Sequence, residues 1–447
     1  MHNLKDGALL RQQCYIDGAW VGADSGATIG VNNPATGEAI GSIPKMGAAE
    51  TRRAIIAANA ALPGWRAKTA AERGKLLRRW SELMLENQAD LALIMTSEQG
   101  KPLAEARGEI AYAASYLEWF AEEGRRAYGE IIPPNGPDRR LLVTREPVGV
   151  CAAITPWNFP AAMITRKAGA ALAAGCTMIA KPATQTPFSA LALAELAERA
   201  GIPKGVFSVV TGAARDIGGE ICANPIVRKL SFTGSTEIGS QLIAQCAPTV
   251  KKLSMELGGN APFIVFDDAD LDAAVEGALA AKFRNTGQTC VCVNRFLVQA
   301  GTYEQFIQRL NEKMQAFSIG NGLEGVHDIG PVINQNAVAK VQSHIQDALD
   351  KGAKLIRGGR PHAAGALFFE PTLIADVTPE MDVATQETFG PLAAVFKFET
   401  ERQALEMAND TDFGLASYCY TNNLGRAWRM SQQLEYGMVG INKGIIS

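Results

Sequence analysis

Residues 148–180 begin with Val148-Gly-Val-Cys-Ala-Ala-Ile154, an apolar run typical of a buried strand. A helical pattern follows over 161–174, and Thr177-Met-Ile-Ala180 is a second apolar run. The alternation continues with helices predicted over 187–200, 214–223 and 235–246 and strands over 207–210 and 229–232. Four strands alternating with helices predict an α/β fold with a parallel sheet of the nucleotide-binding kind. Ligands of such sheets bind at the carboxyl ends of the strands, here the loops after Ile154, Ala180 and Phe232.

The flanking sequence extends this pattern in both directions. Helices are predicted over 48–62, 70–96 and 103–127, and the second begins with Thr69-Ala-Ala-Glu72, a capping-box sequence. After residue 255 we expect a second α/β domain, with strands over 263–266 and 295–298 and helices over 271–283 and 302–317.

Residues 128–150 interrupt the alternation. Pro133-Pro-Asn-Gly-Pro137 is a turn cluster between two short extended runs, and Leu141-Leu-Val-Thr144 is the second of these runs. We predict a protruding hairpin here that meets a partner subunit.

Composition limits the classes of function. The length of 447 residues suits about three domains or two large ones. The composition, 47% hydrophobic and 20% charged, is that of a folded chain with large cores. The 43 basic and 46 acidic residues nearly balance, so the overall charge favours neither nucleic acid nor an anionic membrane as a partner. We find no membrane-length apolar run and no apolar signal core, and we therefore expect a cytoplasmic protein. The eight cysteines and four histidines are dispersed, which predicts free thiols and no metal site.

Five short segments place reactive or polar side chains at the ends of predicted strands and helices. They are Thr155-Pro-Trp-Asn-Phe-Pro160, Ile179-Ala-Lys-Pro182, Ser231-Phe-Thr-Gly-Ser-Thr-Glu-Ile-Gly239, Met255-Glu-Leu-Gly-Gly-Asn260 and Gly287-Gln-Thr-Cys-Val-Cys292. A cysteine beside a glycine suits a nucleophile, a glutamate at a strand-to-loop break suits a general base, and an asparagine in a rigid turn suits an oxyanion.

Two of the segments suit ligand binding. Gly234-Ser235 opens a helix, where free N–H groups and the helix dipole favour a phosphate. Lys181 ends a buried strand, where a lysine tends to meet a ligand or a carboxylate. Taken singly, four of the segments have a plainer interpretation: a buried small thiol, a solvated loop glutamate, a packed turn or a surface lysine. The segment from Ser231 to Gly239 is by itself a weak signal.

Together, in chain order, the segments resemble the signature of the NAD(P)-dependent aldehyde dehydrogenase superfamily. The matching residues are Pro156-Trp-Asn-Phe-Pro160, Lys181-Pro-Ala183, Phe232-Thr-Gly-Ser-Thr236, Glu256-Leu-Gly-Gly259, Gly287-Gln-Thr-Cys290 and Glu387-Thr-Phe-Gly-Pro391. The resemblance covers nearly the whole chain. It implies two Rossmann-like parallel-sheet domains and a small β-hairpin oligomerisation element. These would be a cofactor-binding domain at 1–126 and 146–255, a catalytic domain at 256–431, and an oligomerisation element at 127–145 and 432–447.

The resemblance also implies residue roles. Cys290 attacks the aldehyde carbonyl, and the Asn158 amide and the Cys290 backbone N–H hold the oxyanion. Hydride passes to the nicotinamide, and Glu256 activates the water that hydrolyses the thioester. The cofactor residues implied are Lys181 at the adenosine ribose, Glu387 at the nicotinamide ribose, Ser235 with Gly234 at the pyrophosphate, and Pro156, Trp157 and Phe389 along the cleft.

The third residue after Lys181 bears on the choice of cofactor. Members that prefer NAD often have a glutamate at this position, whereas this chain has Thr184. Without the carboxylate a 2′-phosphate is not repelled, and Lys181 attracts it. We therefore predict that NADP is preferred and NAD tolerated, unless Thr184 is merely a loop residue.

Within the superfamily, three stretches resemble the succinate-semialdehyde dehydrogenases: Ala162-Met-Ile-Thr-Arg-Lys167, Lys282-Phe-Arg-Asn-Thr-Gly-Gln-Thr-Cys-Val-Cys292 and Gly444-Ile-Ile-Ser447. This likeness implies that Arg166, Arg284 and Ser447 bind the distal carboxylate of the aldehyde, for which an arginine fork is suited. Surface salt bridges of the two arginines are the alternative. Glutarate semialdehyde also stays open as a substrate, because one extra methylene gives only about 1–3 kcal/mol of discrimination.

The same subfamily suggests regulation and assembly. Some members form a reversible Cys-x-Cys disulfide, so Cys290 and Cys292 are a predicted redox switch; simple packing of a second thiol is the alternative. Members continue past the position of Ser447 into a strand that pairs across subunits, so we expect a homodimer or a weakened homotetramer here. Two other functions stay open: a catalytically silent binding relative, and an acylating enzyme that uses coenzyme A, which Glu256 disfavours.

Overall fold

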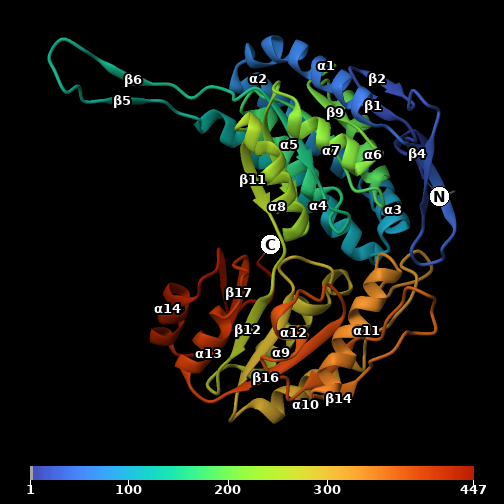
Figure 1. Ribbon diagram of the computed structural model, residues 1–447, viewed down its shortest axis with the longest axis vertical. Helices are drawn as coiled ribbons and strands as arrows, with labels where there is room; N and C mark the ends of the chain where they lie inside the picture. The colour runs from blue at the N-terminus through green and yellow to red at the C-terminus, as the bar shows by residue number, and fades with distance from the viewer. Residues whose placement is uncertain (1–3, 447) are drawn as a thin grey trace. The chain divides into compact units, whose positions relative to one another are not determined.

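Two compact units make up the chain in the computed structural model, which describes residues 4–446 (Figure 1). Within this range, unit 1 contains residues up to 33, 38–99 and 106–256, and unit 2 contains 34–37, 100–105 and the residues from 257 onward. Each unit is built on a seven-stranded, mostly parallel sheet. The predicted α/β fold with two parallel sheets is therefore confirmed, while the functional roles of the domains stay predictions.

The sheet of unit 1 has the strand order β11-β10-β7-β8-β9-β1-β2. Its parallel part consists of β7 (Val150–Ile154), β8 (Thr177–Lys181), β9 (Phe207–Val209), β10 (Val227–Thr233) and β11 (Lys252–Glu256). The hairpin of β1 (Cys14–Ile16) and β2 (Ala19–Val21) extends one edge in the antiparallel sense. Every residue of β8 is buried, as expected for a strand covered by helices on both faces.

Helices surround this sheet at nearly all the predicted positions. They are α1 (Ala48–Arg66), α2 (Ala70–Glu86), α3 (Gln88–Gln99), α4 (Leu103–Glu123), α5 (Ala162–Ala173), α6 (Pro187–Arg199), α7 (Ala214–Ala223) and α8 (Thr236–Cys246). The capping box is present, because Thr69 Oγ1 accepts from the Glu72 N–H and the Glu72 carboxylate accepts from the Thr69 N–H.

The single helix predicted over 70–96 is wrong, because the structure has two helices there. Asn87 ends the first helix, and both its backbone N–H and its side-chain amide donate to the carbonyl of Leu83. An asparagine side chain that bonds its own helix in this way competes with continuation of the helix. The helix predicted over 103–127 also ends early, at Glu123, where a 3₁₀ turn (Gly124–Arg126) begins.

Two antiparallel ribbons complete unit 1. One pairs β3 (Thr28–Asn32) with β4 (Ala39–Pro44), and the other pairs β5 (Glu130–Ile132) with β6 (Leu141–Val143). The second is the predicted hairpin, and Figure 1 shows it reaching away from the sheet and helices of unit 1. Ile131 is 83% exposed and Leu142 is 69% exposed, so the ribbon carries apolar side chains with nothing packed on them in the described chain.

The sheet of unit 2 has the strand order β14-β15-β16-β13-β12-β17-β18, and only β14 at its edge is antiparallel. The strands are β12 (Ala261–Val265), β13 (Val293–Gln299), β14 (Lys354–Arg357), β15 (Thr372–Ala375), β16 (Leu392–Phe398), β17 (Ala416–Tyr420) and β18 (Met438–Ile441). Its helices are α9 (Leu271–Phe283), α10 (Tyr303–Met314), α11 (Gln335–Asp350), α12 (Asp382–Thr385), α13 (Glu401–Asn409) and α14 (Leu424–Gln433).

Apolar side chains fill both faces of this second sheet. Phe263 and Phe296 lie in one buried cluster, whereas the next residues along each strand, Ile264 and Leu297, lie in another. This alternation follows from the two-residue period of a strand. Arg295 adds buried hydrogen bonds. Its guanidinium donates to the backbone carbonyl of Asn260 and to those of Met407 and Ala408 at the end of α13.

Among residues 4–446 there is no helix long and apolar enough to cross a membrane. The cytoplasmic location stays a prediction.

Candidate active site

Four neighbouring parallel strands of unit 1, β8, β7, β10 and β11, end at one edge of the sheet. The register pairs Ile154 with Lys181 and Thr233 with Glu256. Two backbone hydrogen bonds continue beyond the strands, from Thr155 N–H to the Lys181 carbonyl (3.1 Å) and from Gly234 N–H to the Glu256 carbonyl (3.0 Å). The sheet therefore brings four of the five predicted segments together, since parallel strands carry their carboxyl ends to the same edge.

Asn158 lies in the turn between β7 and α5 and is only 3% exposed. The carboxylate of Glu109 on α4 accepts hydrogen bonds from the backbone N–H groups of Ala161 (3.0 Å) and Ala162 (3.2 Å), at the end of this turn. A carboxylate at a helix N-terminus satisfies free N–H groups and the helix dipole. Glu109 thus anchors the turn that carries Asn158, a role that sequence inspection missed because the contact spans 52 residues.

Lys181 is 5% exposed, and burial lowers the pKa of its side chain to about 8. Its ammonium donates to the carbonyl of Pro182 (3.1 Å), and no carboxylate of residues 4–446 forms an ion pair with it. Thr184 lies half-buried in the loop before α6. A buried cation without a charged partner attracts an anionic ligand, and Thr184 adds no negative charge beside it.

Gly234 and Ser235 connect β10 to α8. Ser235 is the N-cap of the helix, and its hydroxyl accepts from the Ile238 N–H (3.4 Å). The side chain of Ser235 is exposed, so the N-terminus of this 11-residue helix is open to solvent in the described chain. This is the geometry that favours a phosphate group.

Glu256 ends β11 and borders a cavity of about 640 Å³ within unit 1, which Arg166 and Lys167 of α5 also line. Lys167 is 7% exposed and donates to the Ser231 hydroxyl (2.9 Å). Burial lowers the pKa of Lys167 to about 8, although the negative charge of Glu256 opposes this shift. Sequence inspection missed Lys167, and its one signal was a lysine within the otherwise apolar helix that follows Arg166.

Arg166 is held by two tyrosines of α4. Its guanidinium donates to the Tyr112 hydroxyl (3.1 Å) and lies 4.8 Å from the centre of the Tyr116 ring. No carboxylate between residues 4 and 446 forms an ion pair with Arg166, so the predicted alternative of a surface salt bridge is wrong for this residue. Stacking on an aromatic face orients the fork and leaves its charge uncompensated.

Cys290 lies in unit 2, in the turn between a 3₁₀ segment (Arg284–Gly287) and β13. All eight cysteines fall in the described residues 4–446, and Cys290 is the one that is not buried. Asn285, Thr286 and Gly287 are all left-handed, with φ of 51°, 58° and 78°. Such a backbone is strained for a β-branched residue, and it persists only where surrounding contacts hold it.

Gly259 joins two more predicted site residues. A side-chain Cβ at this position would lie 2.2 Å from the Cys290 carbonyl oxygen, so only glycine permits the approach. The Gly259 N–H donates to a carboxylate oxygen of Glu387 (3.0 Å). Burial raises the pKa of Glu387 to about 7. Phe389, two residues further, is left-handed with φ of 57°.

The remaining predicted residues have separate positions. Cys292 is buried, and its sulfur lies 3.4 Å from the Lys282 carbonyl and 3.5 Å from the Val293 carbonyl. Arg284 is half-buried directly after α9, and Trp157 and Pro156 are half-buried in the turn that carries Asn158. Ser447 lies outside the described residues. No disulfide joins Cys290 and Cys292 in the described residues, and the redox switch stays a prediction.

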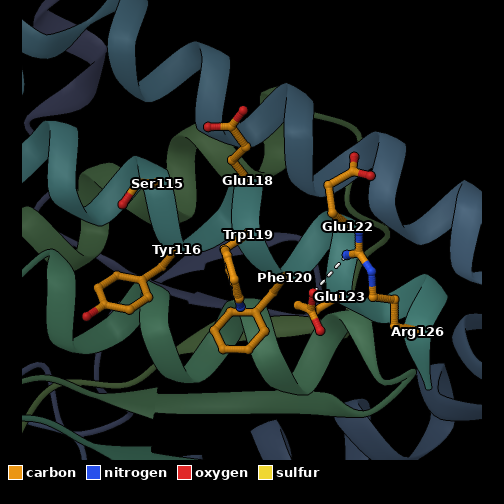
Figure 2. A pocket seen from close by; sticks show the side chains of 8 residues that line it. All are labelled: Ser115, Tyr116, Glu118, Trp119, Phe120, Glu122, Glu123 and Arg126. Atoms are coloured by element: carbon orange, nitrogen blue, oxygen red, sulfur yellow. Dashed lines mark hydrogen bonds and ion pairs between the residues drawn. The ribbon is translucent and has the colours of Figure 1, made fainter. Parts of the chain in front are cut away.

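A second hollow, of about 890 Å³, lies on the last turns of α4 (Figure 2). Figure 2 shows Trp119 and Phe120 among the lining side chains, together with the ion pair of Glu123 with Arg126 (2.8 Å). Trp119 is 63% exposed. The eight lining residues include none of the predicted site residues, so we do not include this hollow in the candidate site.

Comparisons with known proteins identify the family of the chain. The aldehyde dehydrogenase family matches residues 20–447. The chain is 67% identical over 444 residues to a glutarate-semialdehyde dehydrogenase of Pseudomonas aeruginosa, covering 99% of this chain and 92% of that protein. It is 62% identical over 444 residues, with the same coverage, to an NADP(+) succinate-semialdehyde dehydrogenase of Escherichia coli. The crystal structure of succinate-semialdehyde dehydrogenase from Burkholderia pseudomallei matches with a TM-score of 0.99 and 63% identity, over 100% of this chain and 92% of that one. The chain therefore belongs to the aldehyde dehydrogenase family.

Proposed function

We propose that this protein oxidises a short aldehyde with a distal carboxylate, succinate or glutarate semialdehyde, to the dicarboxylic acid, with NADP as the preferred electron acceptor. The observation that carries the proposal is the position of Cys290, a partly exposed thiol on a turn that the surrounding backbone holds in a strained conformation. Relatives at 67% and 62% identity are named for these two substrates.

The reaction would follow from the chemistry of three side chains. The Cys290 sulfur attacks the carbonyl carbon and forms a C–S bond, while the Asn158 amide and the Cys290 N–H hold the oxyanion. A bound nicotinamide would accept the hydride, which leaves a thioester on Cys290. Glu256 then takes a proton from water, the hydroxide attacks the thioester, and the C–S bond breaks to release the acid and the Cys290 thiolate.

The residues of unit 1 suit a cofactor with a 2′-phosphate. Lys181 supplies a buried cation, Thr184 supplies no opposing charge, and Ser235 opens a helix N-terminus. Glu387, whose carboxylate the Gly259 N–H holds, would bind the nicotinamide ribose. We assign Gly234 to the pyrophosphate of the cofactor, and we assign Pro156, Trp157 and Phe389 to further contacts with the cofactor.

Arg166, Arg284 and Ser447 would bind the distal carboxylate of the substrate. Arg166 supports this best, because two tyrosines hold its fork and leave its charge without a carboxylate in the described part of the chain. The chain is similar to both kinds of semialdehyde dehydrogenase. This similarity fits a site that binds the distal carboxylate and tolerates one additional methylene in the substrate.

The first test measures the reduction of NADP, followed by the absorbance of the NADPH that forms, at about 340 nm. The Arg284→Ala variant should raise KM for succinate semialdehyde about 10- to 100-fold, the worth of a lost charged hydrogen bond, with kcat little changed. Butanal, which lacks the carboxylate, should show no such rise, and Cys290→Ser should reduce no NADP with either aldehyde. An equal effect of Arg284→Ala on both aldehydes would contradict the assignment.

Cofactor choice is tested at Thr184. Thr184→Glu places a carboxylate where a 2′-phosphate would lie, so kcat/KM for NADP should fall at least about tenfold while that for NAD is kept or rises. Thr184→Gln, of equal size but neutral, is the matched control and should fall much less. If the two variants lose NADP activity equally, charge at this position does not set the preference.

We also propose that Cys290 and Cys292 form a disulfide when hydrogen peroxide removes their two thiol hydrogens and leaves as water. Peroxide treatment should lower the mass of the peptide that spans both residues by two hydrogens and stop NADP reduction, and dithiothreitol should restore both. The Cys292→Ser variant should show neither the mass loss nor the rescue. Oxygen addition at Cys290 with Cys292 unchanged would contradict the switch.

Assembly into a homodimer or homotetramer is proposed through the β5–β6 ribbon, whose exposed apolar side chains suit a second copy of the chain. Light scattering should give the mass of two or four chains. A variant with Ile131→Asp and Leu142→Asp should fall to one chain, whereas Val326→Asp, at a site 94% exposed in unit 2, should not change the mass. A native chain that is monomeric at micromolar concentration would overturn this assignment.

A further inference from the structure

The turn that carries Cys290 receives one hydrogen bond from a distant strand. Tyr418 of β17 donates its hydroxyl to the backbone carbonyl of Val291 over 2.7 Å. Val291 stands between Cys290 and Cys292, is 7% exposed, and belongs to the turn rather than to a strand. The acceptor is therefore the buried peptide group between Val291 and Cys292, one peptide beyond the one that directly follows the predicted nucleophile.

The tyrosine itself is immobilised. Tyr418 is 1% exposed, and its strand pairs with β12 at Phe263 and with β18 at Gly440. Its ring lies 5.8 Å from that of Phe263, and a Cβ at Gly440 would come within 3.2 Å of it. A phenol on a strand that is paired on both sides in this way offers a donor in one fixed position.

The phenol also stays protonated. Burial raises the pKa of Tyr418, and a negative charge on the neighbouring Cys292 or Cys290 raises it further. The hydroxyl is consequently a donor at every pH at which the enzyme would work.

The need for this donor follows from the backbone on the other side of the turn. The chain enters the turn through three consecutive left-handed residues, Asn285 to Gly287, which store strain. On that entering side Thr286 donates to the Gly330 carbonyl (3.0 Å), and Gln288 accepts from the Ile333 N–H (2.9 Å). On the leaving side, the Val291 carbonyl has the Tyr418 hydroxyl as its described donor.

We propose that Tyr418 is a positioning residue for Cys290: its hydrogen bond to the Val291 carbonyl fixes the Val291–Cys292 peptide, and so holds the turn that carries the Cys290 thiol and backbone N–H in the reactive geometry. The proposal rests on the proposed function for the reaction that Cys290 performs. It does not make Tyr418 a catalytic residue, because the hydroxyl contacts the turn.

Tyr420 provides a matched control on the same strand. It is 3% exposed, its ring stacks on Phe263 at 4.9 Å, and it points to the same face as Tyr418. No hydrogen bond of its hydroxyl is found among residues 4–446. Tyr418→Phe and Tyr420→Phe therefore remove the same atom from similar surroundings, and only the first removes a bond to the turn.

Two measurements on the full chain test the proposal. The first is kcat and KM for succinate semialdehyde with NADP. Tyr418→Phe should lower kcat about 10- to 100-fold with KM little changed, because the nucleophile is misplaced while the substrate anchors are intact. The second is the rate at which iodoacetamide alkylates Cys290, followed by peptide mass across about pH 6 to 9, which reports on the thiol without any substrate. Tyr418→Phe should change this rate and its pH profile, and Tyr420→Phe should leave both measurements near those of the native chain.

Either of two results would overturn the proposal: native kcat and alkylation in Tyr418→Phe, or equal losses in both variants, which would indicate a general packing effect. Thermal melting of both variants verifies that they fold. If the native chain oxidises no semialdehyde, the proposed function fails, yet the alkylation comparison still decides whether Tyr418 positions Cys290.

Discussion

The candidate site in unit 2 depends on one close approach of two backbones, where Gly259 lies against the carbonyl oxygen of Cys290. A Cβ would lie 2.2 Å from that oxygen, so any other residue at 259 would displace the turn that carries the predicted nucleophile. The same glycine donates its N–H to Glu387. A loop after one strand, a turn before a second and a loop before a third are thereby fixed to one another. Because Gly259 has no side chain, these three segments of the chain can pack against one another.

Uncompensated positive charge is the second organising feature, and it lies in unit 1. Lys181, Lys167 and Arg166 are buried or partly buried, and their described partners are a carbonyl, a hydroxyl and aromatic rings rather than carboxylates. Burying a cation without an ion-pair partner costs stability, so one such lysine at the end of β8 and a second cation pair on α5, where Glu256 opposes the charge of Lys167 only in part, suit anionic ligands. Two such ligands are expected from the chemistry, a phosphorylated cofactor and a substrate carboxylate. The pKa values of Lys181 and Lys167, lowered to about 8 by burial, show how strongly these sites are removed from water.

Most elements between residues 148 and 314 were predictable because each has a local signature. The strands there were predicted from apolar runs of four to seven residues, and the helices from their apolar faces. Outside this range, Thr69-Ala-Ala-Glu72 indicates the start of a helix. The break at Asn87 was not predicted, since a capping asparagine looks like any polar residue on an exposed helix face. The strands β1 and β2 were also missed, although Asp17-Gly18 between them is a two-residue hairpin turn sequence. Their place at the edge of the sheet depends on pairing of β1 with β9, which lies far away in the chain.

The amino-acid sequence alone was enough to predict the chemistry proposed for this protein: a cysteine, a glutamate, an asparagine and a lysine stand at strand or helix ends, and local pattern is enough to predict those ends. Tertiary structure alone decided which groups hold them in place. Glu109 reaches the turn of Asn158 across 52 residues, and Tyr418 reaches the turn of Cys290 across 127. Neither contact has a signature in the chain, because a hydrogen bond between distant segments depends on strand order and register, and these are set by packing of the whole sheet.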